Sequence, residues 1–291
     1  MAQLATLYRG GLGDVIERYL IPGQDAGYWQ ALKEQGHDIH VVLCTLNPVA
    51  KELFETNPLV SSVQHVPYED NYKELWKNVL DKSGFRLAKE VIDSSQHRWT
   101  RPGLVLTEEE KQQAEVLPDN YIVIHPFAGQ PHRCWRGLVA TEDVVDWCIN
   151  EGYRVVLLGG DSLRHEHEKD KHLEEMCDYE RPGLINWVNR ASLRLQFFAA
   201  MHCQKYIGTN SCFASAASVQ RIPSFLITSS KMRLHFEYST FGIFRNLRAN
   251  ETQYLFFDEL PHCDLQEFIL HFLDGDREWD FERASEIFDE Y

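Results

Sequence analysis

The sequence of 291 residues contains no run of about eighteen apolar residues, the length that a membrane-crossing helix needs. It also lacks a basic N-terminal stretch followed by an apolar one, as a secretory signal would require. Its seven cysteines are scattered without C-x-x-C spacing, so neither a disulfide framework nor a structural zinc site is expected. These absences predict a cytoplasmic protein with reduced thiols.

Positive charge is scarce as well: 29 Lys and Arg residues stand against 44 Asp and Glu residues, a formal net charge of −15. The average field therefore repels polyanions, and a nucleic acid or an anionic membrane would need a local basic patch to bind. What is present is an ordinary globular composition, with 44% hydrophobic and 12% aromatic residues. A chain of this length suits two domains with a cleft between them.

Apolar strands alternate with helices along most of the chain. Strands are expected at 4–8, 38–44, 60–66, 121–126, 153–158, 184–187, 205–208 and 224–227. Helices are expected at 15–20, 25–35, 48–55, 72–79, 86–91, 141–151, 166–176, 193–201 and 213–219, and 93–117 reads as a linker with an acidic helix start at Thr107. This alternation predicts an α/β fold of two facing Rossmann-like domains with parallel sheets, which bind ligands beyond the carboxyl ends of their strands. The expected domains are 1–112 and 118–274, followed by a C-terminal helix at 276–291.

A glycine-rich turn, Gly10-Gly11-Leu12-Gly13-Asp14, follows the first strand. Glycines let the backbone approach a ligand closely, and the N-terminus of the next helix attracts an anion. The third glycine of G-x-G-x-x-G is absent, which weakens a dinucleotide-dehydrogenase interpretation. Asp14 fits two roles at this point, either a general base toward an acceptor hydroxyl or a cap of the following helix.

Three further segments follow strands of the second half. The loop that runs from His125 to Trp135 carries small residues and Arg133, a composition that suits a diphosphate or, equally, a surface loop. Gly159-Gly160-Asp161 precedes a polar stretch in which Glu166 or Glu168 could accept a ribose hydrogen bond, whereas metal binding by His165 and His167 is disfavoured because i and i+2 positions of a helix do not face each other.

The last of these segments, Gly208-Thr209-Asn210-Ser211, ends a strand and leads into a helix of small residues. It offers hydroxyls and N–H groups at a second helix N-terminus that can receive an anion. The alternative is that Asn210 or Ser211 is a plain helix cap. Cys212 is not expected to be a nucleophile, because no partner base is near it in the sequence.

Taken together, these segments resemble glycosyltransferase family 9, the heptosyltransferase-like enzymes with the GT-B fold. Gly11 to Ile16 resembles the family's opening turn, so the resemblance assigns Asp14 the role of the base that deprotonates the acceptor. His125-Pro126 through Trp135 resembles the loop with a Lys-x-Trp signature, and Arg133 takes the position of the lysine that meets the donor phosphates. The donor-binding residues that follow from the resemblance and from these segments are Gly11, Gly13, Ala128, Gly129, Arg133, Gly160, Glu166, Thr209, Asn210 and Ser211.

The sequence departs from the family's Asp-Ser-Gly-x-x-His stretch, because Asn210, Cys212 and Ser215 replace its aspartate, glycine and histidine. The resemblance implies an inverting transfer of a sugar from a nucleoside-diphosphate donor to a glycan or another hydroxyl acceptor, with neither cofactor nor metal. Two alternatives stay open: a viral-type transferase acting on hydroxymethylated DNA through a basic face that includes Arg9, and an inactive nucleotide-sugar-binding relative. A nucleotide-sugar epimerase or dehydrogenase is disfavoured, because the third glycine and a Tyr-x-x-x-Lys site that it would need are missing.

Overall fold

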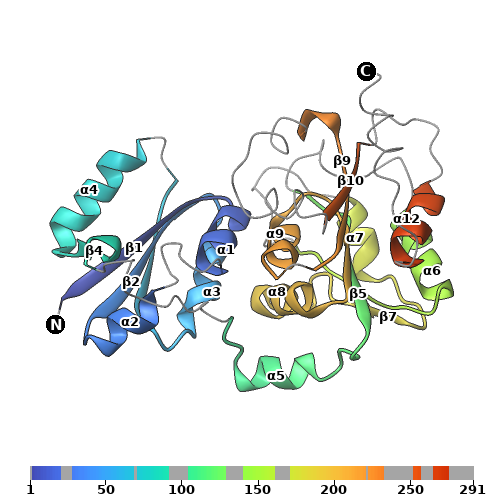
Figure 1. Cartoon of the computed structure of the whole chain (residues 1–291), viewed down its shortest axis with the longest axis horizontal. Coiled ribbons are helices and arrows are strands. Elements are labelled where there is room, and N and C mark those ends of the chain that lie inside the picture. Colours follow the sequence, from blue (N-terminus) through green and yellow to red (C-terminus); the bar gives the residue numbers. More distant parts are fainter. Residues whose placement is uncertain are drawn as a thin grey trace.

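The computed structural model describes residues 2–20, 28–68, 71–91, 104–128, 140–160, 171–220, 222–232, 252–256 and 265–274. They form two parallel sheets with helices around them, one sheet in each half of the chain (Figure 1). The predicted α/β fold of two facing domains is confirmed. Within the described residues, no helix is both long and apolar enough to cross a membrane.

The N-terminal sheet has four parallel strands in the order β3-β2-β1-β4. The strands are β1 (Gln3–Gly10), β2 (Asp38–Thr45), β3 (Val60–Val66) and β4 (Arg86–Leu87). The helices are α1 (Leu12–Leu20), α2 (Trp29–Glu34), α3 (Glu52–Glu55) and α4 (Tyr72–Ser83), with 3-10 turns η1 (Pro48–Lys51) and η2 (Ala88–Glu90). Aromatic rings of Tyr19, Trp29 and Phe54 pack together on one face of this sheet, and the Trp29 indole N–H donates to Thr6 Oγ1 at 3.1 Å.

The C-terminal sheet has six parallel strands in the order β10-β9-β8-β5-β6-β7. The strands are β5 (Tyr121–His125), β6 (Arg154–Leu157), β7 (Leu184–Asn186), β8 (Lys205–Gly208), β9 (Ser224–Thr228) and β10 (Thr252–Phe256). The helices are α6 (Thr141–Asn150), α7 (Lys171–Cys177), α8 (Leu193–His202), α9 (Cys212–Val219) and α12 (Leu265–Asp274), with a 3-10 turn η5 (Ser230–Met232).

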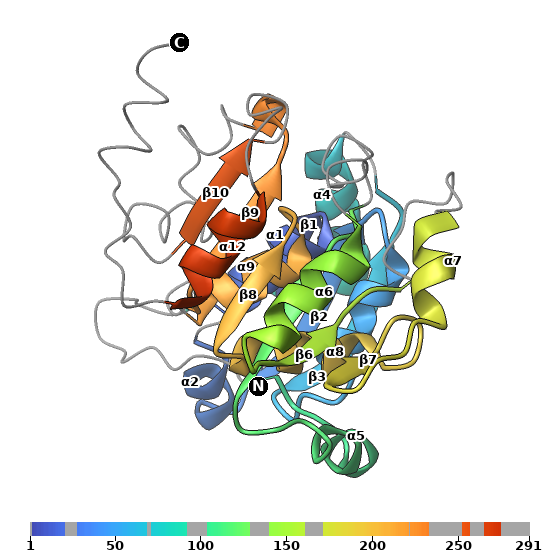
Figure 2. The same ribbon diagram turned by 90° about the vertical axis from the view of Figure 1, so that its right-hand side faces the viewer.

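Helices cover both faces of the C-terminal sheet, and Figure 2 shows α6 and α12 side by side on one of them. Side chains alternate between these faces along each strand, as a doubly covered parallel sheet requires. In β5, Ile122 and Ile124 join the apolar cluster beneath α6 and α12, whereas Tyr121 and Val123 join the cluster on the face of α8 and α9. This second cluster continues into the N-terminal domain, so the two domains share an apolar contact.

The structure differs from the predicted local structure in several segments. The segment 86–91 is not an α-helix, because Arg86 and Leu87 pair with β1 as strand β4 and only Ala88–Glu90 form the short 3-10 helix η2. Strand β10 and helix α12 were not predicted. The expected helices at 25–35 and 166–176 are described only as α2 and α7, and the C-terminal helix expected at 276–291 lies outside the described residues.

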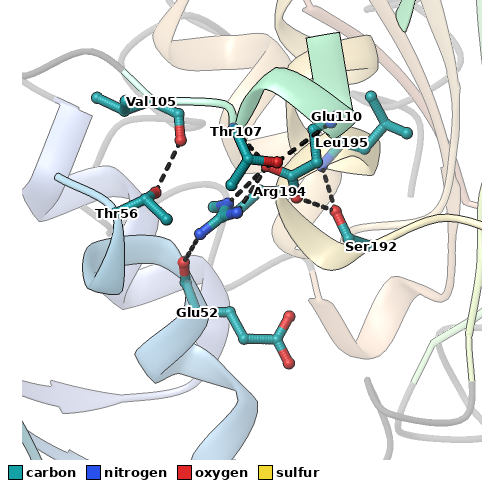
Figure 3. A network of polar contacts seen from close by, with 8 residues as sticks. All are labelled: Glu52, Thr56, Val105, Thr107, Glu110, Ser192, Arg194 and Leu195. Atoms are coloured by element: carbon teal, nitrogen blue, oxygen red, sulfur yellow. Dashed lines mark hydrogen bonds and ion pairs between the residues drawn. The ribbon is translucent and has the colours of Figure 1, made fainter. Parts of the chain in front are cut away.

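The predicted helix start at Thr107 is confirmed by α5 (Glu108–Ala114), which begins with a capping box between Thr107 and Glu110. Helix α5 joins the two domains, and its Glu110 meets Arg194 of α8 (Figure 3). The guanidinium donates from Nη2 and Nε to Glu110 Oε2 at 2.6 and 3.1 Å, and from Nη1 to the carbonyl oxygen of Glu52 at 3.1 Å. Ser192 donates to the other carboxylate oxygen of Glu110. We call Glu110, Arg194, Glu52 and Ser192 the α5 clasp.

Candidate functional site

Helices α1 and α9 bring the two glycine-bearing strand ends together at the contact between the domains (Figure 1). Gly13, in the first turn of α1, lies directly against the first turn of α9. A Cβ atom at Gly13 would be 3.2 Å from Ser215 Oγ and 3.7 Å from the Cα of Cys212. The absence of a side chain at Gly13 therefore lets the N-terminal ends of these two helices approach each other.

Asp14 occupies the third position of α1 and its side chain is exposed. Its Oδ2 accepts a hydrogen bond of 2.8 Å from the backbone N–H of Gly11, which caps the start of the helix. The preceding Gly10 has φ +116°, and a Cβ there would lie 2.3 Å from Asp14 Oδ2, so only glycine fits. The capping role considered for Asp14 is therefore present, and the hydrogen bond holds its carboxylate beside the glycine turn.

On the C-terminal side, the turn between β8 and α9 rests on a buried histidine. His125, the last residue of β5, is 3% exposed and its Nδ1 lies 3.0 Å from Ser211 Oγ. Its carbonyl oxygen accepts from the Thr209 N–H at 3.0 Å. A Cβ at Gly208 would lie 2.6 Å from the same carbonyl oxygen, so this strand end requires glycine. Burial lowers the pKa of His125 to about 3, and the ring is therefore neutral near pH 7.

The side chains of Ser211 and Cys212, at the start of α9, have surroundings that bear on their chemistry. Ser211 is the N-cap of α9 by position, but its hydroxyl makes no cap hydrogen bond to this helix. It contacts His125 and the Tyr206 hydroxyl instead, at 3.0 and 3.2 Å. Burial raises the pKa of the Cys212 thiol to about 12, which agrees with the expectation that this residue is not a nucleophile.

The turn after β6 is hydrogen-bonded to a side chain of α8. The Gly159 N–H donates to Gln196 Oε1 at 2.9 Å, and the Gln196 amide donates to the carbonyl oxygen of Ala191 at 3.1 Å. A Cβ at Gly159 would lie 2.6 Å from the Phe127 ring, so the loops after β5 and β6 are in close contact. Gly160 is buried in this turn, and Ala128 lies at the end of the described part of the β5 loop.

Six of the predicted site residues lie at the starts of helices α1 and α9. Gly11, Gly13 and Asp14 form the start of α1, and Thr209, Asn210 and Ser211 lead into α9, whose first turn contacts Gly13. Gly129, Arg133 and Glu166 lie outside the described residues. Arg9, one member of the basic face considered for DNA, donates to the Tyr68 hydroxyl at 3.0 Å and its guanidinium carbon lies 5.1 Å from the Tyr68 ring centroid.

Sequence reasoning assigned no role to His125, Tyr206 or Gln196, although each supports a turn of the site. His125 and Ser211 are 86 positions apart, and Gly159 and Gln196 are 37 apart. No local pattern signals a contact over such a separation. Of the seven cysteines, the five in the described residues are free thiols.

No family model matches this sequence, and no curated protein matches it. Solved structures do match. ADP-heptose LPS heptosyltransferase II of E. coli is 14% identical, with a TM-score of 0.57 over 94% of this chain and 98% of that chain. The glycosyl transferase family 9 protein of Veillonella parvula is 13% identical, with a TM-score of 0.53 over 89% of this chain and 87% of that chain.

The chain has the fold of the heptosyltransferases. The resemblance that the sequence motifs carry is thereby confirmed at the level of the fold. The same GT-B-like fold also occurs in an epimerase. UDP-GlcNAc 2-epimerase of Methanocaldococcus jannaschii is 8% identical, with a TM-score of 0.50 over 95% of this chain and 93% of that chain. The missing third glycine argues against a Rossmann-type epimerase, but it does not bear on an epimerase with this fold.

Proposed function

We propose that this chain is an inverting glycosyltransferase that moves a sugar from a nucleoside-diphosphate donor to a hydroxyl acceptor. One observation carries the proposal: Gly13, in the first turn of α1, lies against Cys212 and Ser215 in the first turn of α9, so the starts of the two helices are adjacent. Two adjacent helix N-termini concentrate positive dipole character, which suits a pyrophosphate. Heptosyltransferases with known structures share this arrangement of two domains.

In the proposed reaction, the acceptor hydroxyl loses its proton to the Asp14 carboxylate as its oxygen attacks the anomeric carbon. The bond between that carbon and the β-phosphate oxygen breaks, and the nucleoside diphosphate leaves with the electron pair. One displacement inverts the configuration. The Gly11 N–H holds Oδ2 of Asp14 at 2.8 Å, which orients the carboxylate for this proton transfer.

The leaving diphosphate develops negative charge that fixed donors must stabilise. We assign this role to the backbone of residues 209–211, to the first turn of α9 and to the Arg133 guanidinium. We also assign Ala128 and Gly129 to the binding of the phosphates, and Gly160 and Glu166 to the binding of the nucleoside. The donor is the substrate, and the proposed chemistry needs no additional cofactor. The acceptor is a glycan or another hydroxyl compound, because the net charge of −15 disfavours hydroxymethylated DNA.

Variants of Asp14 test this mechanism. Asp14→Asn keeps an oxygen that can cap α1 but removes the base, so we expect transfer to fall by about 10²–10⁴-fold. The dissociation constant for the nucleoside diphosphate, measured by calorimetry, should change little. Asp143→Asn is the matched control, because Asp143 is exposed and holds the same position in the first turn of α6.

The activity assay incubates the protein with sugars carried by uridine, adenosine, guanosine and cytidine diphosphates, with and without hydroxyl acceptors. Acceptor-dependent release of nucleoside diphosphate, together with a new glycoside, supports a transferase. An epimerised nucleotide sugar formed without acceptor would replace the proposal by an epimerase. Binding without turnover would point to an inactive relative, and unchanged transfer by Asp14→Asn would remove Asp14 from the mechanism.

A further inference from the structure

A row of three polar side chains lies beneath the turn that leads into α9. The row begins at the His125 ring, continues through the Ser211 hydroxyl 3.0 Å away and reaches the Tyr206 hydroxyl after a further 3.2 Å. Tyr206 in turn contacts the carbonyl oxygen of Thr209 at 3.4 Å. The His125 ring packs edge to face against Phe213 and Phe127, whose ring centroids are 4.8 and 5.9 Å from its own.

Counting the protons gives this row a direction. A carbonyl oxygen can only accept, so Tyr206 must donate its single proton to Thr209. Ser211 must then donate its own proton to the Tyr206 oxygen, which leaves Ser211 as the acceptor from His125. Only this direction makes all three contacts at once. A neutral imidazole has one N–H, so the row requires the proton on Nδ1 and leaves Nε2 as an acceptor.

We infer that His125 is a positioning residue for the donor-binding turn, acting through the hydroxyl of Ser211. The inference rests on the proposed function, in which the first turn of α9 receives the donor diphosphate. By drawing the Ser211 hydroxyl inward, the Nδ1–H of His125 keeps it from capping the N–H groups of that first turn. A serine at this position would ordinarily cap its helix, and a cap would compete with an anionic ligand for the same donors.

The state of the ring tests the hydrogen-bond row without any assay of function. In the full-length protein with ¹⁵N-labelled histidine, the nitrogen shifts and long-range couplings of the His125 ring identify which nitrogen carries the proton. The signals of the His125 ring are assigned as those that are missing from the spectrum of His125→Asn. We expect them to show the proton on Nδ1. A ring protonated on Nε2 would overturn the inference, because Ser211 would then donate to His125 and the row would run in the opposite direction.

Binding measurements test the consequence for the ligand. His125→Phe fills the pocket without a donor, so the freed Ser211 hydroxyl turns to cap α9 and nucleoside diphosphate binding weakens about tenfold. His125→Asn places an amide N–H near the former Nδ1 and should restore affinity to within about threefold of wild type. Each variant's unfolding temperature is recorded, and His125→Asn carries the test if His125→Phe fails to fold.

The double variant separates positioning from simple structural support. If His125 acts by restraining the hydroxyl, removing that hydroxyl in His125→Phe/Ser211→Ala should bind no worse than His125→Phe alone. Losses that add up would overturn the inference. Should the wild type bind none of the uridine, adenosine, guanosine or cytidine diphosphates, the proposed function fails, whereas the ring tautomer still decides whether the row runs from His125.

Discussion

Replacing Arg194 by methionine should remove the cation of the α5 clasp and leave the Glu110 carboxylate buried without a positively charged partner. The side chains of Arg194 and Glu110 are only 10% and 8% exposed, so solvent cannot take over the interaction. Removing one partner of a buried ion pair costs about 3–5 kcal/mol. At about 2 °C per kcal/mol for a chain of this size, the Tm should fall by about 6–10 °C.

Arg190→Met is the matched control, because Arg190 lies near Arg194 in the chain and also pairs with carboxylates. Its side chain is 44% exposed, and its partners Asp178 and Glu180 lie 3.9 and 3.8 Å away on the surface. Such pairs contribute less than about 1 kcal/mol. Unfolding by urea and by heat, followed by circular dichroism, measures both variants. An Arg194→Met protein as stable as the Arg190→Met protein would refute the reasoning from burial.

The pH dependence of the same comparison gives a second check. Burial acts to raise the pKa of Glu110, but hydrogen bonds from Arg194 and Ser192 outweigh it and hold this pKa below its usual value. The stability that the carboxylate contributes is therefore present above the ordinary glutamate pKa and is lost as the pH falls through the lowered value. In Arg194→Met, burial should raise the pKa of Glu110. The stability gap to wild type should be widest near pH 7 and should narrow below about pH 4.

Three glycine substitutions should differ in stability according to the atoms that the new methyl group contacts. Gly10→Ala combines a positive φ with a contact of 2.3 Å to Asp14, so it should lose about 1–3 kcal/mol. It should lose more than Gly84→Ala, which has φ +71° but open space around it, and equal losses in urea unfolding would contradict the clash. Gly13→Ala should destabilise the protein only while Ser215 keeps its hydroxyl 3.2 Å from the new Cβ, so a loss that persists unchanged in Ser215→Ala would argue against that contact.

Much of the fold could be predicted because strand and helix periodicity is local. Strand β3 was predicted with its observed bounds, and the acidic residues after Thr107 gave the start of α5. Strand β4 could not be predicted, because two residues become a strand only through pairing with Leu4 and Ala5 of β1. Strand β10 is likewise a short edge strand that depends on its partner β9.

The candidate site was predictable in its glycines and not in its supports. Gly13 and Gly208 stand at turns whose strand and helix neighbours are visible in the sequence, so their place at these turns could be anticipated. The partners of Glu110 and His125 could not, since Arg194 is 84 residues from the first and Ser211 is 86 from the second. Contacts of this kind arise from how the domains and strands pack, and residue type alone does not encode them.

The α5 clasp bears on how this protein can be divided for experiments. A cut just before residue 118, at the expected boundary, would produce a C-terminal fragment whose Arg194 has lost both Glu110 and the carbonyl group of Glu52. In that fragment the Arg194 guanidinium would have no carboxylate partner, and apolar residues of α8 that pack against the N-terminal half would be exposed. A fragment that begins ahead of Thr107 would retain α5 and with it the carboxylate that neutralises this arginine.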